Sequence, residues 1–313
     1  MRATQAPLTA SLRPEPADDS RALDGDSLAG FLLALSAYLL WGALPLYLRL
    51  LDHVAVPEVL AHRVIWSVPL ALAVLWATGR LRSLGRAMRD VRMLGMAALT
   101  AALVSCNWGV YLYSIASGQA MSAALGYYIN PIFSVLLAAL VLRERLSPLQ
   151  WAAVALAALA VVILTIEAGR LPILSLALTV SWGFYALAKR ALPIGPNQSF
   201  ALEVMLLSPF ALGYLGWLGG EGTLAFGATG GRDIALLMGC GVVTAVPLML
   251  YANGAKRLRL TTIGLMQYIA PTCIFLIAVF LFGEPFEGAK LWAFPMIWGA
   301  LVLYSADLWA RRR

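Results

Sequence analysis

Three ionisable side chains in this 313-residue sequence lie inside long apolar segments, where charges are rare. His62 and Arg63 lie in the first third of one such segment, and Glu203 lies in the first third of another. A charged side chain at the centre of a bilayer costs about 2.5–3.5 kcal/mol on insertion scales, so each needs a compensating interaction. These groups are expected either to bind a solute or an ion, or to pair locally, as His62 or Arg63 could with Glu58.

Glu203 is the candidate for coupling to protons or to a cationic group. No Lys or Arg lies near it in its own apolar segment, so a partner must come from another segment, from solvent or from a bound solute. Burial in a partly dry environment disfavours a charged carboxylate, so Glu203 is expected to take up and release protons. Arg63 lies 140 residues earlier and has the opposite charge.

A polar stripe follows one face of a predicted helix. Asn107, Tyr111 and Ser114 are spaced i, i+4 and i+7, which places them on one side of the helix, turned away from lipid. Amides and prolines recur in two other segments, and a proline at depth is tolerated where the backbone lines a cavity. The polar groups either line a cavity or form hydrogen bonds between helices. The candidates from this set are Asn107, Tyr111, Tyr251 and Gln267.

Three tryptophans, Trp41, Trp108 and Trp182, lie within apolar segments rather than at their ends. They could form aromatic walls for an organic solute, or pack only against the small neighbours Gly42 and Gly183. Glu284 lies at a segment end, next to the start of the following helix, as does Glu144, and is expected to cap that helix.

The elements that must position these groups are membrane-spanning helices. Hydrophobic residues make up 61% of the chain and charged residues 12%, whereas a soluble domain has roughly a quarter charged residues. A span of the hydrocarbon core needs about 20 apolar residues. The sequence therefore predicts an all-α membrane protein with ten transmembrane helices, at residues 28–51, 57–78, 93–117, 120–142, 148–167, 171–190, 198–219, 234–254, 260–282 and 289–310.

Basic residues are distributed unequally between the two sides of this arrangement. With the N-terminus inside, eighteen Lys and Arg lie on the cytoplasmic side, four lie outside, and Arg63 lies within a helix, which accounts for all 23. This asymmetry follows the positive-inside rule, predicts that both termini are cytoplasmic, and explains the net charge of +7 without a nucleic-acid partner. Residues 1–27 are expected to form a disordered cytoplasmic tail and residues 311–313 a basic cytoplasmic end.

An internal repeat divides the chain into residues 28–169 and 170–310. The sequence Tyr128-Ile129-Asn130-Pro131 recurs 140 residues later as Tyr268-Ile269-Ala270-Pro271, and Tyr111 corresponds to Tyr251. Because each half has five predicted helices, an odd number, the second half enters the membrane from the opposite side. Inverted five-helix repeats are typical of secondary transporters, although they also occur in channels and could be retained only for packing.

These features resemble the EamA family of the drug/metabolite transporter superfamily. The similar stretches include 40–47, 61–63, 107–111, 126–131 and 267–271, and Phe282-Gly283-Glu284 keeps the Gly-Glu pair that ends the fourth helix of each family repeat, whereas Arg143 replaces that glycine in the first half. The resemblance implies a ten-helix permease of the bacterial plasma membrane with cytoplasmic termini. It also implies a small-molecule metabolite or drug-like solute as substrate, without choosing one.

Three functions remain open from the residues alone. A secondary transporter working by alternating access is favoured, and its energy must come from a gradient, because no Gly-rich phosphate loop ending in Gly-Lys-Ser/Thr is present. A channel or a non-transporting membrane scaffold is the alternative. An intramembrane enzyme would need a metal cluster or a nucleophile with its base, and the chain offers few residues for either, because it has two histidines and three unpaired cysteines. No catalytic residue, metal site or cofactor is predicted, and the expected partners are lipid, a small solute and protons.

Overall fold

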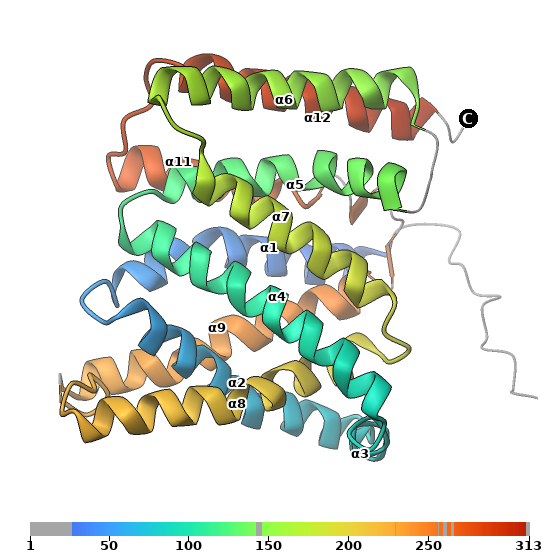
Figure 1. The fold of residues 1–313 in the computed structure, drawn as a ribbon. Helices are drawn as coiled ribbons and strands as arrows, with labels where there is room; N and C mark the ends of the chain where they lie inside the picture. Colours follow the sequence, from blue (N-terminus) through green and yellow to red (C-terminus); the bar gives the residue numbers. More distant parts are fainter. Residues whose placement is uncertain are drawn as a thin grey trace, which may run out of the picture.

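The computed structural model describes residues 27–310, except 142–145, 229, 256, 259–261 and 264–265. The described chain is all-helical, as the sequence predicts, and its helices pack into one bundle (Figure 1). The expected tail, the basic end and Glu144 lie outside the described residues. The helices are α1 (Leu28–Arg49), α2 (Val56–Ala77), α3 (Leu81–Ala87), α4 (Val91–Ala116), α5 (Ala120–Val141), α6 (Pro148–Ala168), α7 (Ile173–Arg190), α8 (Pro196–Gly220), α9 (Gly231–Ala255), α11 (Ile269–Leu276), the π-helical η1 (Ile277–Leu281) and α12 (Lys290–Ala310).

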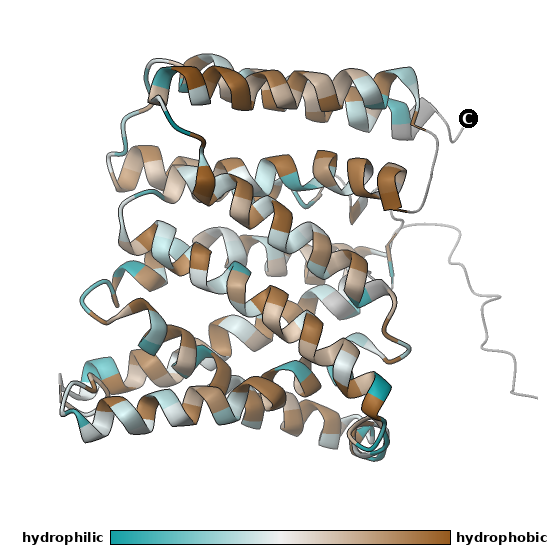
Figure 2. Cartoon of the chain, in the orientation of Figure 1, coloured by the Kyte–Doolittle hydropathy of each residue, from teal (hydrophilic) through white to brown (hydrophobic). Residues whose placement is uncertain are grey.

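Seven helices in the described part of the chain are long and apolar enough to cross a membrane: α1, α2, α4, α5, α6, α8 and α9. Two shorter apolar helices cover Ile173–Lys189 and Ile269–Leu281, and α12 has 21 residues. Apolar residues follow most of each helix, and the most hydrophilic residues gather mainly toward helix ends and connections (Figure 2). The chain is therefore a multi-pass membrane protein.

The predicted segments agree with these helices to within a few residues, with two differences. The short helix α3, which contains Arg82 and Arg86, lies in the connection that was predicted only as a basic loop. Gln267, predicted within a span, lies in a turn before α11, where its N–H donates to the carbonyl of Ile263 at 3.0 Å. The first difference lies in a charged connection, and the second is a turn within an apolar stretch, which hydropathy alone does not reveal.

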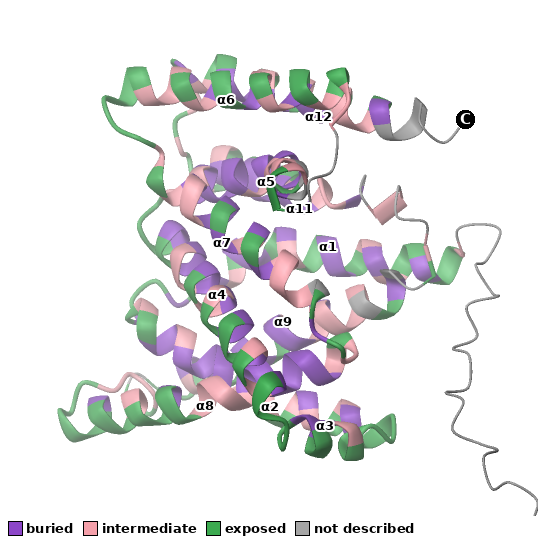
Figure 3. Ribbon diagram, turned by 45° about the vertical axis from the view of Figure 1, so that its right-hand side comes forward, coloured by how far each residue is buried: buried purple, intermediate pink, exposed green. Residues whose placement is uncertain are grey.

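Burial distinguishes central from peripheral helices. In the most apolar stretch of α5, 56% of the residues are buried, against 28% in that of α6. Helix α6 pairs with α12 at one side of the bundle (Figures 1 and 3). The other close helix pairs are α1 with α9, α2 with α8, α2 with α9, α4 with α7, α5 with α7, α1 with α11, and α5 with α11.

Small residues allow two of these close approaches. A Cβ added to Gly42 on α1 would lie 2.5 Å from Cβ of Cys273 on α11. A Cβ added to Gly183 on α7 would lie 2.5 Å from the ring of Phe133 on α5. These glycines let the helices meet backbone to side chain, as is common between membrane helices.

Carboxylates tie the ends of helices that are distant in sequence. Glu284 accepts hydrogen bonds from the backbone N–H of Ala120 at 2.5 Å and of Met121 at 2.9 Å, at the start of α5. The sequence correctly suggested a capping function but assigned it to the wrong helix, because only the folded bundle brings Glu284 to α5. Burial raises the pKa of Glu284, and these two hydrogen bonds oppose that shift.

The antiparallel pair α6 and α12 is closed at both ends. Glu167, near the end of α6, accepts a hydrogen bond from the N–H of Ala289, next to the start of α12. Asp307, near the end of α12, accepts a hydrogen bond at 2.7 Å from the hydroxyl of Ser147, the residue before α6. Each helix therefore contacts the beginning of the other through a carboxylate in its last turn.

Candidate functional site

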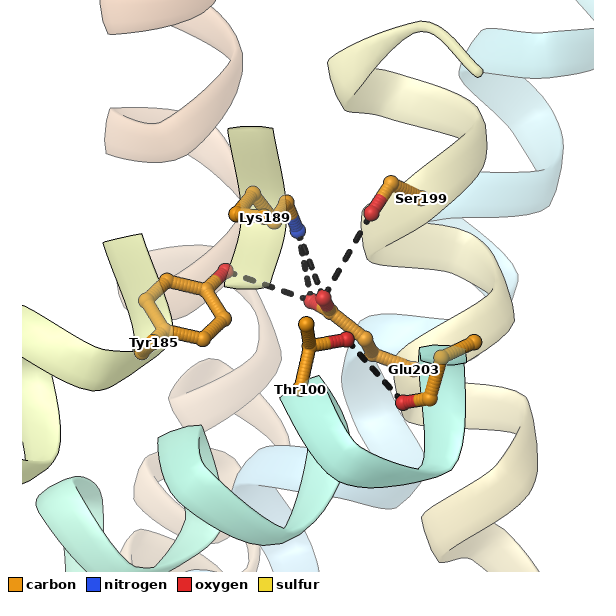
Figure 4. A network of polar contacts seen from close by, with 6 residues as sticks. Thr100, Tyr185, Lys189, Ser199 and Glu203 are labelled. Carbon is orange, nitrogen blue, oxygen red and sulfur yellow. Dashed lines mark hydrogen bonds and ion pairs between the residues drawn. The ribbon is translucent and has the colours of Figure 1, made fainter. Parts of the chain in front are cut away.

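Glu203 is the centre of a buried polar cluster between α7 and α8 (Figure 4). The ammonium of Lys189 donates to both carboxylate oxygens, at 2.7 and 2.8 Å. The hydroxyl of Tyr185 donates at 3.3 Å, and that of Ser199 at 3.4 Å. Glu203 is 1% exposed, so these contacts replace its hydration. A charge-assisted pair of this kind is strong where water is excluded.

Helical periodicity on both sides builds this cluster. Ser199 and Glu203 are four residues apart on α8, and Tyr185 and Lys189 are four residues apart on α7, so both pairs lie on facing sides of their helices. Of the three sources that the sequence left open for a partner of Glu203, another segment, solvent or a bound solute, the structure shows the first. Sequence reasoning missed Lys189, which was counted among the charges at the cytoplasmic surface, although its i, i+4 relation to Tyr185 was visible in the sequence.

Arg63 lies in a different environment, between α2, α4 and α9. Its Nε donates to the hydroxyl of Thr244 on α9 at 3.0 Å, and its guanidinium carbon lies 4.9 Å from the ring centroid of Trp108 on α4. The side chain is buried, and its Nη1 has no hydrogen-bond partner among the described residues. The local pair with Glu58 that the sequence allowed is not formed, because Arg63 has no carboxylate within 4.0 Å in the described chain.

Glu58 instead holds the connection between α8 and α9. Its carboxylate accepts hydrogen bonds from the backbone N–H of Ala225 at 2.9 Å and of Phe226 at 3.1 Å. Nε2 of His62 lies 3.9 Å from the same carboxylate, one helical turn away. Trp66 donates to Nδ1 of His62 at 3.1 Å, and the imidazole stacks on Phe226 at 4.9 Å. His62 therefore packs beside Glu58 and Phe226, and its buried Nε2 has no hydrogen-bond partner among the described residues.

The polar stripe of α4 has two kinds of member. The amide of Asn107 donates to the carbonyl of Leu178 and to the hydroxyl of Ser181 on α7, both at 3.0 Å, and accepts from Tyr127 at 3.4 Å. Asn107 thus links α4 to α7, as the packing alternative proposed. Tyr111 packs against Tyr127 at 5.7 Å between ring centroids, and its buried hydroxyl has no hydrogen-bond partner among the described residues.

The remaining aromatic candidates fall into two groups. Tyr251 on α9 packs against Tyr38 and Trp41 on α1, with ring centroids 5.8 and 5.5 Å apart. Trp182 packs against Tyr185 at 5.4 Å, which places it beside the Glu203 cluster. Gln267 belongs to neither group, since it lies in the turn before α11.

The charged candidates and Tyr111 are buried. Arg63, Tyr111 and Glu203 are each no more than 4% exposed. An open, apolar hollow of about 350 Å³ lies between α2 and α9 and is lined by Trp66, Pro69, Leu70, Met238, Gly239 and Val242. Within the described ranges no group of three His, Cys, Asp or Glu could hold a metal ion.

The chain is similar to known bacterial membrane proteins along most of its length. Residues 28–166 match the EamA-like transporter family. An uncharacterized transporter of Vibrio cholerae is 40% identical over 282 residues, which are 90% of this chain and 93% of that protein. Protein RarD of Streptomyces exfoliatus is 40% identical over 287 residues, covering 91% of this chain and 90% of that protein.

A solved structure, described only as the crystal structure of a protein, has the same fold. It superposes with a TM-score of 0.56 over 91% of this chain and 98% of that chain, at 22% identity. The family resemblance inferred from the sequence is confirmed, and the family is one of transporters rather than enzymes. The chain belongs to the EamA-like transporter family, in which it is similar to RarD along about nine-tenths of its length.

Proposed function

We propose that this protein is a secondary transporter that moves a small organic solute by alternating access between two inverted halves, residues 28–169 and 170–310. In this proposal α1, α2, α4, α5 and α6 correspond to α7, α8, α9, the α11–η1 segment and α12. The substrate path runs between the Arg63 and Glu203 clusters. Protons, a solute gradient or exchange supply the energy.

The observation that carries the proposal is that contacts between the two halves occur in matched pairs. Gly42 packs on Cys273 and Gly183 packs on Phe133, and both members of the second pair correspond to members of the first within one residue of the 140-residue offset. Independently, Glu167 and Asp307 are 140 residues apart and make the two reciprocal contacts between α6 and α12. Matched contacts of this kind support two related halves.

The helix pairs support the same correspondence. Exchanging the two halves converts the pair α1–α9 into α7–α4, and the pair α5–α7 into α11–α1, and all four pairs are in contact. The pairs α2–α8, α5–α11 and α6–α12 are each converted into themselves, and all three are in contact. A two-fold axis in the membrane plane would have this effect, and it is the arrangement in which one central site faces each side in turn.

Arg63 and Glu203 are equivalent in this arrangement. Each is the eighth residue of its helix, α2 or α8. Inversion would place Arg63 nearer the outer surface and Glu203 nearer the cytoplasm. In the proposal, opening toward the cytoplasm separates Lys189 from Glu203, and the exposed carboxylate then binds a proton or a cationic group. Both termini are proposed to be cytoplasmic, on the basis of the Lys and Arg asymmetry.

Spin-label distances in liposomes test alternating access without a known substrate. In a chain lacking its three cysteines, labels are placed on Ser117 and Glu221 at one end of the bundle, and in a second chain on Thr78 and Ala191 at the other. All four positions are exposed. A carrier should show two distances for each label pair, and Glu203→Gln should shift the two distributions in opposite directions.

The control variant for this experiment is Glu287→Gln, which alters an exposed carboxylate in the connection before α12. It should leave both distributions as in the parent chain. One unchanging distance for each pair, in the parent and in Glu203→Gln alike, would favour a static scaffold over a transporter.

A further inference from the structure

We propose that the Arg63 cluster binds the anionic group of the transported solute, and that this solute is an organic acid with an aromatic or other apolar body. The Arg63 cluster consists of the side chains of Arg63, Trp108, Tyr111, Tyr127 and Thr244. This inference rests on the proposed transport function and adds the substrate class. It follows from an uncompensated buried charge, from two buried donors without hydrogen-bond partners among the described residues, and from the aromatic neighbours of Arg63.

Arg63 carries a buried positive charge that no carboxylate among the described residues balances. A guanidinium stays charged in proteins, and burying a charge is costly unless it is paired. Glu203, at the equivalent position, has Lys189 at 2.7 Å. Arg63 is 4% exposed and has no carboxylate within 4.0 Å among the described residues. Its charge is partly offset by the ring face of Trp108, but a face of a neutral ring does not replace an anion.

Thr244 orients the guanidinium of Arg63. The hydroxyl of Thr244 donates to the carbonyl of Cys240 at 2.7 Å and accepts from Nε of Arg63 at 3.0 Å. Both functions of this hydroxyl are therefore used, and the Nε side of the guanidinium is fixed. Nη1 is left as a buried donor without a partner among the described residues. A hydrogen-bond acceptor next to Nη1 would give this donor its missing partner.

The hydroxyl of Tyr111 is a second group without a hydrogen-bond partner among the described residues. It is buried, and it lies within electrostatic range of Arg63. Tyr127, the neighbour of Tyr111, donates its own hydroxyl proton to Asn107. Two unsatisfied donors beside one positive charge match a group with two negative oxygens, because a carboxylate accepts several hydrogen bonds.

The aromatic neighbours of Arg63 indicate the body of the solute. The ring centroid of Trp108 lies 4.9 Å from the guanidinium carbon, and Tyr111 and Tyr127, whose ring centroids are 5.7 Å apart, interact electrostatically with Arg63. Aromatic faces favour stacking with an aromatic ring or contact with an apolar one. A strongly hydrated inorganic anion would gain nothing from them. The Arg63 cluster therefore matches the chemistry of an aromatic carboxylate better than that of chloride or phosphate.

Thermal unfolding of the purified full-length chain in detergent tests the inference. The probes are benzoate, its neutral analogue benzamide, and chloride at equal ionic strength. Benzoate at about one hundred times its Kd should raise the unfolding midpoint by about 5 °C, whereas benzamide and chloride should not. Arg63→Lys should keep a reduced shift, and Arg63→Gln should lose it. Arg49→Gln, which removes an exposed arginine, should keep the full shift.

Tyr111→Phe provides a variant that removes one hydroxyl and leaves the packing intact. It should weaken benzoate binding by about tenfold, because it removes one hydrogen bond to the charged carboxylate. This variant keeps the inference testable if Arg63→Gln does not fold.

The inference is wrong if the wild-type chain shows no benzoate shift, if benzamide or chloride gives the same shift, or if Arg63→Gln or Tyr111→Phe retains full benzoate binding. None of these results bears on whether the two halves alternate, because the spin-label distances measure that directly. Conversely, benzoate binding at Arg63 together with static distances would identify a binding protein that does not transport.

Discussion

The Glu203 and Arg63 clusters occupy the same place along α8 and α2 and differ in how their charge is met. Glu203 is held by Lys189, Tyr185 and Ser199, so its carboxylate is satisfied within the protein. Arg63 has one neutral hydroxyl and one aromatic face, and its Nη1 is unpaired among the described residues. In our proposal the satisfied charge of Glu203 holds the bundle together, whereas the unsatisfied charge of Arg63 binds the solute. The difference suggests an ion pair that holds the conformation on one side and a binding group on the other.

The largest expected effect comes from breaking the satisfied cluster. Lys189→Met leaves Glu203 buried without its cation and should lower the free energy of unfolding by about 3–5 kcal/mol. The double variant Lys189→Met/Glu203→Leu should recover most of this loss, because it removes both charges. Denaturation in mixed micelles, followed by helical circular dichroism, measures these differences.

Arg63→Gln in the same assay sharpens the comparison. Because Arg63 has no carboxylate partner among the described residues to leave behind, its replacement should leave the free energy of unfolding within about 1 kcal/mol of the wild type. If Arg63→Gln is as damaging as Lys189→Met, the two clusters are both structural. The contrast on which the substrate class depends would then be lost.

A smaller effect separates two residues of one polar stripe. Asn107→Leu breaks the link between α4 and α7 and should cost about 1 kcal/mol, the size of a typical hydrogen bond between membrane helices. Tyr111→Phe removes a hydroxyl that makes no hydrogen bond in the described structure and should change stability by less than about 0.5 kcal/mol. The same denaturation assay compares them, and equal losses would show that the Tyr111 hydroxyl stabilises the folded chain as the Asn107 amide does.

The smallest expected effect is a pH dependence at Glu284, outside the membrane spans. Burial raises the pKa of this carboxyl above its ordinary value of 4.5, so the folded state binds the proton more tightly than the unfolded state does. The resulting stability is present below pH 4.5 and is lost as the pH rises through the folded value. Glu284→Gln should flatten this decline, and Glu287→Gln, in the same connection, should not. Identical pH profiles for the wild type, Glu284→Gln and Glu287→Gln would show that Glu284 does not cause the pH dependence.

Apolar runs bounded by charges and glycines were enough to predict the long helices and the short connections between them. The turns at Gly118 and Gly169 have φ of +69° and +62°, values that glycine adopts readily, and the apolar runs beside them became α4 to α7. Sequence reasoning failed where a contact joins distant segments. It placed Lys189 at the surface and assigned Glu284 to the wrong helix, because a one-dimensional pattern does not say which helix end faces which side chain. It found Arg63 and Glu203 because a charge in an apolar run is visible without the fold.

The central claim, that the halves are inverted, is tested most directly by thiol labelling at equivalent positions. Ser117, after α4, and Arg257, after α9, are 140 residues apart and exposed. Each is replaced by cysteine in a chain lacking Cys106, Cys240 and Cys273, and intact cells are treated with a membrane-impermeant maleimide. Inversion with cytoplasmic termini predicts that Ser117→Cys is labelled at once and Arg257→Cys only after the membrane is permeabilised. Labelling of both positions from the same side would contradict the inverted arrangement.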